Sequence, residues 1–534
     1  MSSPTPGPTP DSTHGPAARR PSYDVVVVGG GHNGLTAAAY LGRAGLSVLV
    51  LERLGHVGGA AVSAPAFPGL PPRLSRYSYL VSLMPEQLVR DLDLDVRLAS
   101  RTVSSYTPVL RDGHASGLLV ERPEGAATRE SFRSLTGSDD EHDAWRAFYA
   151  EVSGLAEVVA PTLMAPLPRE HELRDLVDAG VWHDVVARPL GEAVERRFTD
   201  DTVRGVVATD ALIGTFASLN DPSLIQNRCF LYHLIGNGTG EWRVPIGGMG
   251  AVTDALAHAA VEAGAELLTG AEVQRITAHD GGAEVSWAGG TVTARHVLSG
   301  VAPWLLQRLL DLDPDPDTKP VGSQLKVNFL LERLPRLRSG IDPAVAFAGT
   351  LHLGEEYSRL ETAYAEAAGG TLPSRLPGEV YCHSLTDPSI LGDVPAGTHT
   401  LTYFGLHTPA DLFAASPDEQ RAAALQRAIA SLDEHLVDPM ASVVARGPGG
   451  EPCMEAKIPQ DIEADLAMPG GHIFHGDLEW PWATEHALLD SPDQQWGVQT
   501  GLPSVFLCGS GSRRGGAVSG LGGHHAAQAV LASR

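Results

Sequence analysis

The hydrophobic pattern near the N-terminus predicts a strand, a helix and a second strand in succession. Residues 24–28 form a short apolar run with four valines, which is typical of a buried parallel strand. Residues 35–44 carry the small and apolar side chains of a helix, and Gly45 follows where glycine often ends a helix. Residues 46–51 form a second apolar run. The pattern therefore predicts a βαβ unit of the kind that binds dinucleotides.

Glycines occupy the turn between the first strand and the helix in a G-x-G-x-x-G pattern. Gly29 permits a tight turn, Gly31 lets a pyrophosphate approach the backbone, and Gly34 lets the helix pack close to the strand. His32 and Asn33 lie in the first turn of the helix, where free N–H groups and the helix dipole attract phosphate. These residues are predicted to bind the cofactor.

An acidic residue and a second glycine pair follow the second strand. Glu52 stands at the strand end, where its carboxylate can accept hydrogen bonds from both ribose hydroxyls. Arg53 comes next, and Gly58 and Gly59 follow a few residues later. This extended pattern resembles flavoproteins of the glutathione-reductase-like and amine-oxidase-like types, in which the glycines let the loop pass close to the diphosphate. We therefore predict that the cofactor is FAD.

A second segment resembles the part of such flavoproteins that returns to the dinucleotide domain. Residues 244–250 are glycine-rich and precede a helical pattern that ends near Gly264. A strand pattern then includes Val273, whose backbone the resemblance places against the adenine. Taken alone, the glycine run is equally compatible with an ordinary loop before a helix.

A third glycine-rich segment lies at the C-terminus. Residues 504–508 predict a strand, and Gly509 and Ser510 follow it directly. Ala517 and Val518 belong to the loop that precedes the last helix, and we expect this loop to present backbone N–H groups to the flavin. The remaining chain is too short for a second βαβ unit that would bind NAD.

These three segments predict one flavin domain that two insertions interrupt. The fold class is α/β, with a Rossmann-like FAD-binding domain and a discontinuous α+β substrate domain made of a mixed sheet and a helical cap. A cleft between the two domains would bind the substrate. The expected boundaries are 23–100, 228–310 and 495–534 for the FAD-binding domain, 101–227 for the helical cap and 311–494 for the rest of the substrate domain.

Periodicity predicts the main elements of the insertions. In the cap, a helix begins near Ser138 with apolar residues at helical spacing, and residues 173–198 form a second helical run. In the other insertion, the predicted elements are strands at 324–331, 378–385 and 398–406 and a helix at 418–436.

Composition narrows the classes of function. The chain has 534 residues and a net charge of -25, which argues against nucleic acid as a partner. Its four cysteines are widely separated, and its 21 histidines form no ligand pattern with acids, so we predict neither a dithiol centre nor a metal site. Cysteine usage suggests the cytoplasm.

The sequence also predicts whether the N-terminal tail is ordered and whether the chain crosses a membrane. Residues 1–22 are rich in Pro, Thr and Gly, which predicts a disordered tail. We expect no transmembrane segment, because no apolar run reaches about 18 residues. Peripheral membrane contact through an apolar entrance to the cleft stays open.

The chain is similar to the carotenoid (phytoene) desaturase-type FAD-dependent oxidoreductases. Within them it resembles the branch of pyridine nucleotide-disulphide oxidoreductase domain-containing protein 2 and its bacterial relatives. The resemblance rests on residues 24–62, 75–79, 385–389, 471–477 and 507–527. It implies hydride transfer from an apolar, lipid- or isoprenoid-like small molecule to flavin N5. A flavin amine or alcohol oxidase, and a non-catalytic flavoprotein with an interaction or regulatory role, are the alternatives.

Three residues are candidates for catalysis. Residues 322–327 resemble the strand in flavin amine oxidases whose lysine reaches the flavin N5, which assigns that role to Lys326. The alternative is a strand lysine that points to solvent. His475 and Asp477 could line the cleft as a base and the acid that orients it, or they could form a structural turn.

Overall fold

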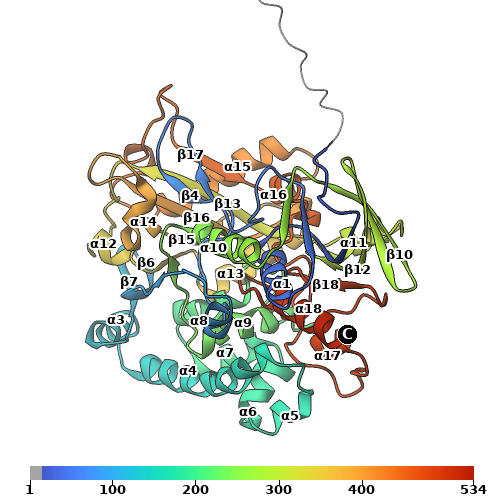
Figure 1. Ribbon diagram of the computed structural model, residues 1–534. Helices are drawn as coiled ribbons and strands as arrows, with labels where there is room; N and C mark the ends of the chain where they lie inside the picture. The colour runs from blue at the N-terminus through green and yellow to red at the C-terminus, as the bar shows by residue number, and fades with distance from the viewer. Residues whose placement is uncertain (1–14) are drawn as a thin grey trace, which may run out of the picture.

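Two seven-stranded sheets, two small two-stranded sheets and a group of helices form residues 15–534, the part of the chain that the computed structural model describes. The small sheets pair β3 (Ser63–Pro65) with β4 (Arg73–Ser75) and β5 (Leu98–Ala99) with β8 (Val244–Pro245). Figure 1 shows the helices of the predicted cap gathered in the lower part of the view, and the strands β13, β16 and β17 of the second sheet in the upper part. This arrangement confirms the predicted fold class, which combines a Rossmann-like α/β domain with a mixed sheet.

Five parallel strands form the centre of the first sheet. Their order across the sheet is β9–β2–β1–β12–β18, and every neighbouring pair is parallel. The carboxyl ends of all five strands therefore lie along one edge, where open α/β sheets bind ligands. The strands are β1 (Ser22–Val28), β2 (Val48–Glu52), β9 (Glu266–Thr269), β12 (Gly290–Ser299) and β18 (Val505–Leu507).

An antiparallel hairpin extends this sheet beside the first half of β12. It consists of β10 (Val273–His279) and β11 (Gly282–Trp287). The chain before β1 packs nearby, because the Trp287 indole donates a hydrogen bond to the carbonyl oxygen of Pro16 (2.8 Å). Residues 15–22 are thus attached to the domain, although they fall within the predicted disordered tail. The rest of that prediction, residues 1–14, lies outside the described residues.

Three helices pack together on this domain at very short range. They are α1 (His32–Arg43), α10 (Met249–Glu262) and α18 (Leu521–Ala532). A Cβ on Gly523 of α18 would lie 1.9 Å from the carbonyl oxygen of Asn33 in α1. Glycine is therefore required where the last helix crosses the first. Two shorter helices, α2 (Glu86–Asp91) and α11 (Pro303–Leu309), lie within the ranges predicted for the same domain.

The second sheet has the order β17–β13–β16–β15–β14–β6–β7 and is mixed, since β14 and β6 are parallel and the other pairs are antiparallel. The predicted strand 324–331 is confirmed. The strand predicted at 378–385 ends early, at Tyr381, because a helical turn begins at His383. The strands are β6 (Val103–Arg111), β7 (His114–Glu121), β13 (Ser323–Leu331), β14 (Thr350–Leu353), β15 (Gly378–Tyr381), β16 (His399–Pro409) and β17 (Met454–Lys457).

Strands β6 and β7 were not predicted, because residues 101–227 were expected to form a helical cap. They are joined by a tight turn at Asp112 and Gly113, whose φ angles are 51° and 76°. An Asp-Gly pair between two apolar strands favours such a turn, because both central residues need positive φ. The hairpin places the first part of this insertion in the second sheet.

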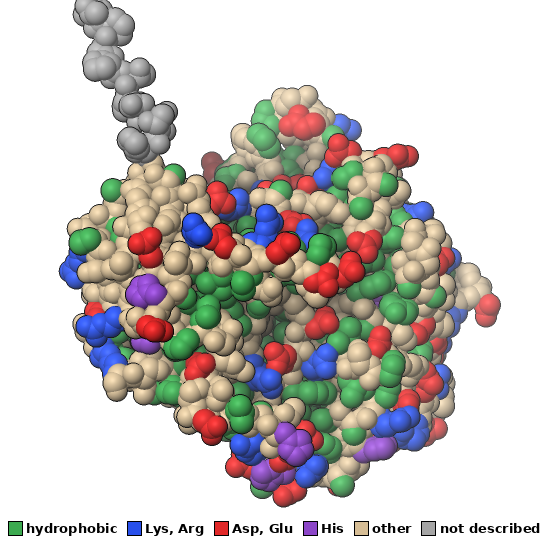
Figure 2. All heavy atoms as spheres, turned by 90° about the vertical axis from the view of Figure 1, so that its right-hand side faces the viewer, with side chains coloured by type: hydrophobic (Ala, Val, Ile, Leu, Met, Phe, Trp, Pro, Cys, Tyr) green, Lys and Arg blue, Asp and Glu red, His purple; other side chains and the backbone are tan. Residues whose placement is uncertain are grey.

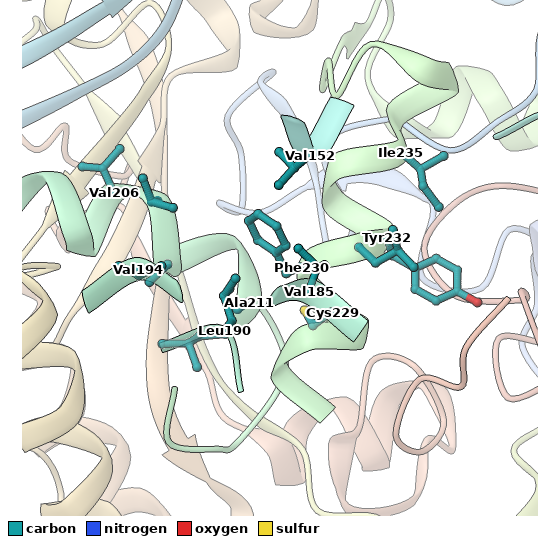
Figure 3. Packing of buried hydrophobic residues seen from close by; sticks show 14 of the residues in the cluster. Val152, Val185, Leu190, Val194, Val206, Ala211, Cys229, Phe230, Tyr232 and Ile235 are labelled. Carbon is teal, nitrogen blue, oxygen red and sulfur yellow. The ribbon is translucent and has the colours of Figure 1, made fainter. Parts of the chain in front are cut away.

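The helices of the cap pack around a core that they share with the second sheet and the C-terminal segment, and Figure 3 shows part of it. The helix predicted near Ser138 is confirmed as α4 (Asp140–Val159), with Trp145, Phe148, Val152 and Leu155 buried. The predicted run 173–198 is divided into shorter helical segments, since Asp178 caps a new start and Pro189 precedes another. The other cap helices are α3 (Ala126–Thr136), α5 (Glu170–Arg174), α6 (Ala179–Trp182), α7 (Leu190–Arg197), α8 (Asp201–Ala208) and α9 (Ile225–Ile235).

The remaining helices surround the second sheet. The helix predicted at 418–436 is confirmed as α15 (Pro417–Asp433). The others are α12 (Pro343–Ala346), α13 (Tyr357–Ala368), α14 (His383–Thr386) and α16 (Pro459–Leu466), whereas α17 (Pro492–Trp496) packs against α18. Figure 2 shows acidic and basic side chains interspersed on one face of the molecule. Among residues 15–534, no helix has the length and apolar character needed to cross a membrane.

Candidate active site

The glycine turn after β1 forms an open cradle at the carboxyl edge of the first sheet. Gly31 pairs with Gly58 in a β-bridge, and a Cβ on Gly59 would lie 3.1 Å from the Gly31 Cα. A Cβ on Gly31 itself would meet only the Gly59 Cα, at 4.0 Å, among the described atoms beyond its chain neighbours. The space in front of Gly31 is thus free for a ligand, beside the N-terminus of α1.

Glu52 is fixed next to this cradle. Its carboxylate accepts hydrogen bonds from the backbone N–H groups of Gly30 and Leu54, both at 2.8 Å, and its side chain is buried. The second segment joins at the same strand end, since the N–H of Ala271 donates to the carbonyl oxygen of Glu52 (2.8 Å). Val273 begins β10 two residues later and is buried. The structure therefore brings Glu52 and the chain around Val273 together.

Arg53 contacts the second insertion. Its guanidinium donates to the carbonyl oxygen of Asp465 (2.6 Å), in the last turn of α16. Arg53 therefore links the first domain to the helix α16, and its contact with the cofactor stays a prediction.

The C-terminal segment reaches the first turn of α1. The Asn33 side-chain amide donates to the carbonyl oxygen of Gly515 (3.2 Å), and the His32 ring hydrogen-bonds to the backbone of Ala517. Burial lowers the pKa of His32 to about 4, so its ring is neutral. Among residues 15–534, His32 Nε2 and Asn33 Oδ1 have no hydrogen-bond partner although they are buried. These free polar atoms lie where a bound nucleotide could satisfy them.

Gly509 and Ser510 stand at the end of β18, beside the turn that follows β12. A Cβ on Gly509 would lie 2.4 Å from the carbonyl oxygen of Gly300, so this approach also requires glycine. Ser510 is half-buried at the same edge. The first and third glycine-rich segments thus meet at one edge of the sheet, together with the chain at Ala271 and Val273 of the second segment.

A cavity of about 450 Å³ lies where the first domain, the second sheet and the cap helices meet. This volume is within the range of small-molecule sites. Each of the three parts contributes to the wall. Representative lining residues are Ala517 and Val518 from the C-terminal segment, Lys326 and Phe404 from the second sheet, and Trp145 and Tyr232 from the cap.

Lys326 is buried in the wall of this cavity and is only 3% exposed, which excludes the alternative that it points to solvent. Its Nζ donates to the carbonyl oxygens of Ser75 (2.7 Å) and Tyr77 (2.8 Å) and lies 4.9 Å from the centre of the Tyr79 ring. Burial holds the pKa of Lys326 well below its usual value, because the charged ammonium loses hydration.

His475 and Asp477 do not form the expected pair. Asp477 lies 3.7 Å from His472, its side chain is 61% exposed, and neither His475 nor Asp477 is among the described residues that line the cavity. The positive φ values of His475 (66°) and Gly476 (148°) turn the chain between the two side chains. Burial lowers the pKa of His475 to about 3, which makes it a weak base. His475 Nδ1 is buried without a hydrogen-bond partner among residues 15–534, so backbone bonding in a turn does not account for it, and the catalytic roles of both residues stay predictions.

Sequence reasoning missed a charged end of the cavity. Arg101, Asp210 and Glu379 line it, together with Tyr381. Burial raises the pKa of Asp210, lowers the pKa of Arg101 and raises the pKa of Glu379 to about 8, where Asp210 contributes as a second acid. Arg101, Asp210 and Glu379 are more than a hundred positions apart in the chain, so no local motif could have identified them together.

Two family models match the chain. The model of flavin-containing amine oxidoreductases matches residues 86–438, which is more than half of the chain. The chain belongs to the flavin-containing amine oxidoreductase family. A model of NAD(P)-binding Rossmann-like domains matches residues 27–87 of this amine oxidoreductase family member, which include the glycine turn and Glu52.

Individual relatives extend the likeness over nearly the whole chain. An uncharacterised protein of Mycobacterium tuberculosis is 50% identical over 96% of this chain and 97% of its own length. Pyridine nucleotide-disulfide oxidoreductase domain-containing protein 2 of Rattus norvegicus is 30% identical over 96% and 94%. The solved structure of putrescine oxidase bound to putrescine has a TM-score of 0.56 and 18% identity over 95% of this chain and 97% of that one, which shows the shared fold.

The cofactor of this flavin-containing amine oxidoreductase is FAD. The residues of the site fit it, since the cradle at Gly31 is open and the polar atoms of His32 and Asn33 lack partners among residues 15–534. The four cysteines are all buried and unpaired. This chain therefore lacks the redox-active cysteine pair that the name of the rat relative would suggest.

Replacing Gly31 by valine should abolish FAD binding without unfolding the protein. The side chain would enter the open cradle, where the nearest described atom beyond its chain neighbours is 4.0 Å away, and would occupy space that the pyrophosphate needs. Gly55→Val is the control, because no described atom beyond its chain neighbours lies within 4 Å of a Cβ there. The measurement is the ratio of flavin to protein absorbance. A Gly31→Val protein that keeps FAD as the control does would contradict the cradle.

Proposed function

We propose that this FAD-dependent oxidoreductase removes a hydride from a small organic molecule bound in the 450 Å³ cavity. Bound FAD would accept the hydride at N5. The observation that supports the proposal most strongly is that one cavity is lined by both domains. Ala517 and Val518 of the C-terminal segment and Lys326 of the second sheet all line it. A substrate in this cavity would contact both domains, and the surrounding protein would hold it in position and exclude water.

The cofactor would extend along the edge where the three segments meet. In this proposal the turn from Gly29 to Gly34 and the N-terminus of α1 bind the pyrophosphate, Glu52 binds the ribose, and the chain at Val273 contacts the adenine. Gly58 and Gly59 provide a flat wall against the diphosphate, which their close approach to Gly31 supports. Gly509, Ser510, Ala517 and Val518 contact the flavin end.

Lys326 would tune the flavin and hold the cavity wall in place. Its ammonium group is anchored by two carbonyl oxygens and the Tyr79 ring, so its position in the wall is fixed. A cation near the flavin raises its electron affinity. The lowered pKa of Lys326 also lets this amine exchange a proton nearer to neutral pH than an exposed lysine can.

The cavity wall supports a substrate that has an apolar body and a polar group. Leu80, Leu83 and Val206 offer apolar surface, whereas Arg101 and Asp210 provide charges at another part of the wall. The resemblance to carotenoid desaturases supports oxidation of a CH–CH unit in the apolar body. Amine oxidation is the second candidate, because the acidic Asp210 favours a cationic substrate and the chain belongs to the amine oxidoreductase family.

Anaerobic mixing with matched substrates should distinguish these reactions. We expect bleaching of the long-wavelength flavin band by one of three compounds of similar chain length: an isoprenoid hydrocarbon, the corresponding alcohol or the corresponding amine. Bleaching by the hydrocarbon identifies CH–CH oxidation, and bleaching only by the amine identifies amine oxidation. If a broad panel of such compounds leaves FAD oxidised while the protein stays loaded, the catalytic proposal fails in favour of a non-catalytic flavoprotein.

Lys326→Met should slow flavin reduction about tenfold or more, equivalent to about 1.4 kcal/mol of activation free energy, while FAD stays bound. The side chain of methionine fills most of the same space but removes the cation. Lys319→Met is the control, because Lys319 forms a partly exposed ion pair with Glu463 (2.6 Å). The readout is the stopped-flow rate of reduction by whichever substrate is active. Equal rates in both variants would remove Lys326 from the reaction.

A further inference from the structure

Three buried side chains with metal-binding atoms lie together at the charged end of the cavity. His352 on β14 and Glu379 on β15 are cross-strand partners, so their side chains extend from the same face of the sheet. Glu355 follows β14 by two residues. One potential ligand atom from each of the three residues lies within 4.8 Å of the others.

Glu355 is the side chain that requires an explanation. It is fully buried, and neither of its carboxylate oxygens has a hydrogen-bond partner among the residues that the structure describes. The hydroxyl group of Thr209 is nearby but does not form a hydrogen bond with it. Buried carboxylates are normally hydrogen-bonded, paired with a cation or bound to a metal. The free oxygens of Glu355 are close to His352 and Glu379, which are the other members of the cluster.

Neighbouring side chains orient the other two groups. The hydroxyl oxygen of Thr107 lies 3.0 Å from His352 Nδ1, so the second ring nitrogen, Nε2, faces Glu379 at 3.8 Å. The Tyr381 hydroxyl donates to the other carboxylate oxygen of Glu379. Metal-binding histidines and carboxylates usually have such outer partners, which fix their orientation.

The charges around the cluster leave room for a divalent cation. Asp210 adds a third carboxyl group close to Glu355 and Glu379, whereas Arg101 contributes a positive charge near Glu379 and Asp210, and Arg122 contributes a second one near Asp210. Three ionised acids beside two guanidinium groups would still leave a net negative charge. A divalent ion would offset this charge, and without it the acids must take up protons.

We propose that His352 Nε2 and the carboxylates of Glu355 and Glu379 bind one divalent transition-metal ion, such as Zn²⁺ or Mn²⁺. One imidazole and two carboxylates are a ligand set that suits these ions. Ligand atoms around a tetrahedral ion are about 3.3 Å apart, given bonds of about 2.0–2.1 Å. Small side-chain rotations would therefore close the present separations of up to 4.8 Å.

The cavity offers the ion an entrance and an open coordination position. His352 and Glu379 line the cavity, whereas Glu355 lies behind them. A water molecule or an oxygen of a bound compound could complete the coordination from the cavity side. The proposed ion would thus lie at the polar end of the same chamber, and its binding does not depend on which substrate the flavin oxidises.

The experiment uses the full-length FAD-loaded protein after treatment with EDTA. We expect one Zn²⁺ or Mn²⁺ to bind per chain in a titration calorimeter, and bound Mn²⁺ to lose its free-ion electron paramagnetic resonance signal. His352→Gln and Glu355→Gln should each weaken binding at least a hundredfold while keeping the flavin spectrum. Glu356→Gln is the control, because Glu356 pairs with Arg359 (3.2 Å) outside the cluster.

Two results would overturn the proposal. The first is a wild-type protein that binds neither ion, which needs no variant to interpret. The second is equal binding by His352→Gln, Glu355→Gln and the control. Flavin content, measured in the same samples, separates loss of the metal from loss of the cofactor site.

Discussion

The close approach of backbone segments at the carboxyl edge of the first sheet is the constraint on which the rest of the structure depends. Gly59 can lie against Gly31, and Gly509 against Gly300, because Gly59 and Gly509 have no side chain. Gly523 permits the same closeness between the last helix and the first. Segments from the beginning, middle and end of the chain thereby build one surface for one cofactor. Any bulk added at these contacts would act on the cofactor site first.

The two insertions convert this surface into a chamber. The second sheet carries Lys326 to the cavity wall, and the cap helices close the side opposite to the sheet. The hairpin β6–β7 ties the cap to that sheet, so the two insertions form one wall although they are separate in the sequence. The chamber combines apolar surface with a charged end, which is suited to a compound with both characters. Chemistry at the flavin and recognition at the charged end could then be adjusted independently.

The sequence predicted local features well and distant ones poorly, for physical reasons. The βαβ unit from Val25 to Glu52 was predictable because its turn, strands and acid lie within one short stretch. The hairpin at Asp112 was missed although its Asp-Gly turn was readable. His475 and Asp477 were paired by their spacing, but positive φ between them separates the side chains. Sheet pairing brings His352 to Glu379, and Asp210 reaches the same place from the cap, which no local pattern reveals.

The most direct test of the account is the flavin content of the purified wild-type chain. The protein is produced without added cofactor, denatured, and the released nucleotide is identified and quantified by chromatography against the protein concentration. The convergence of the three glycine-rich segments predicts about one FAD per chain and no other dinucleotide in comparable amount. A folded protein that carries no FAD, and that takes up none when incubated with an excess, would contradict the account.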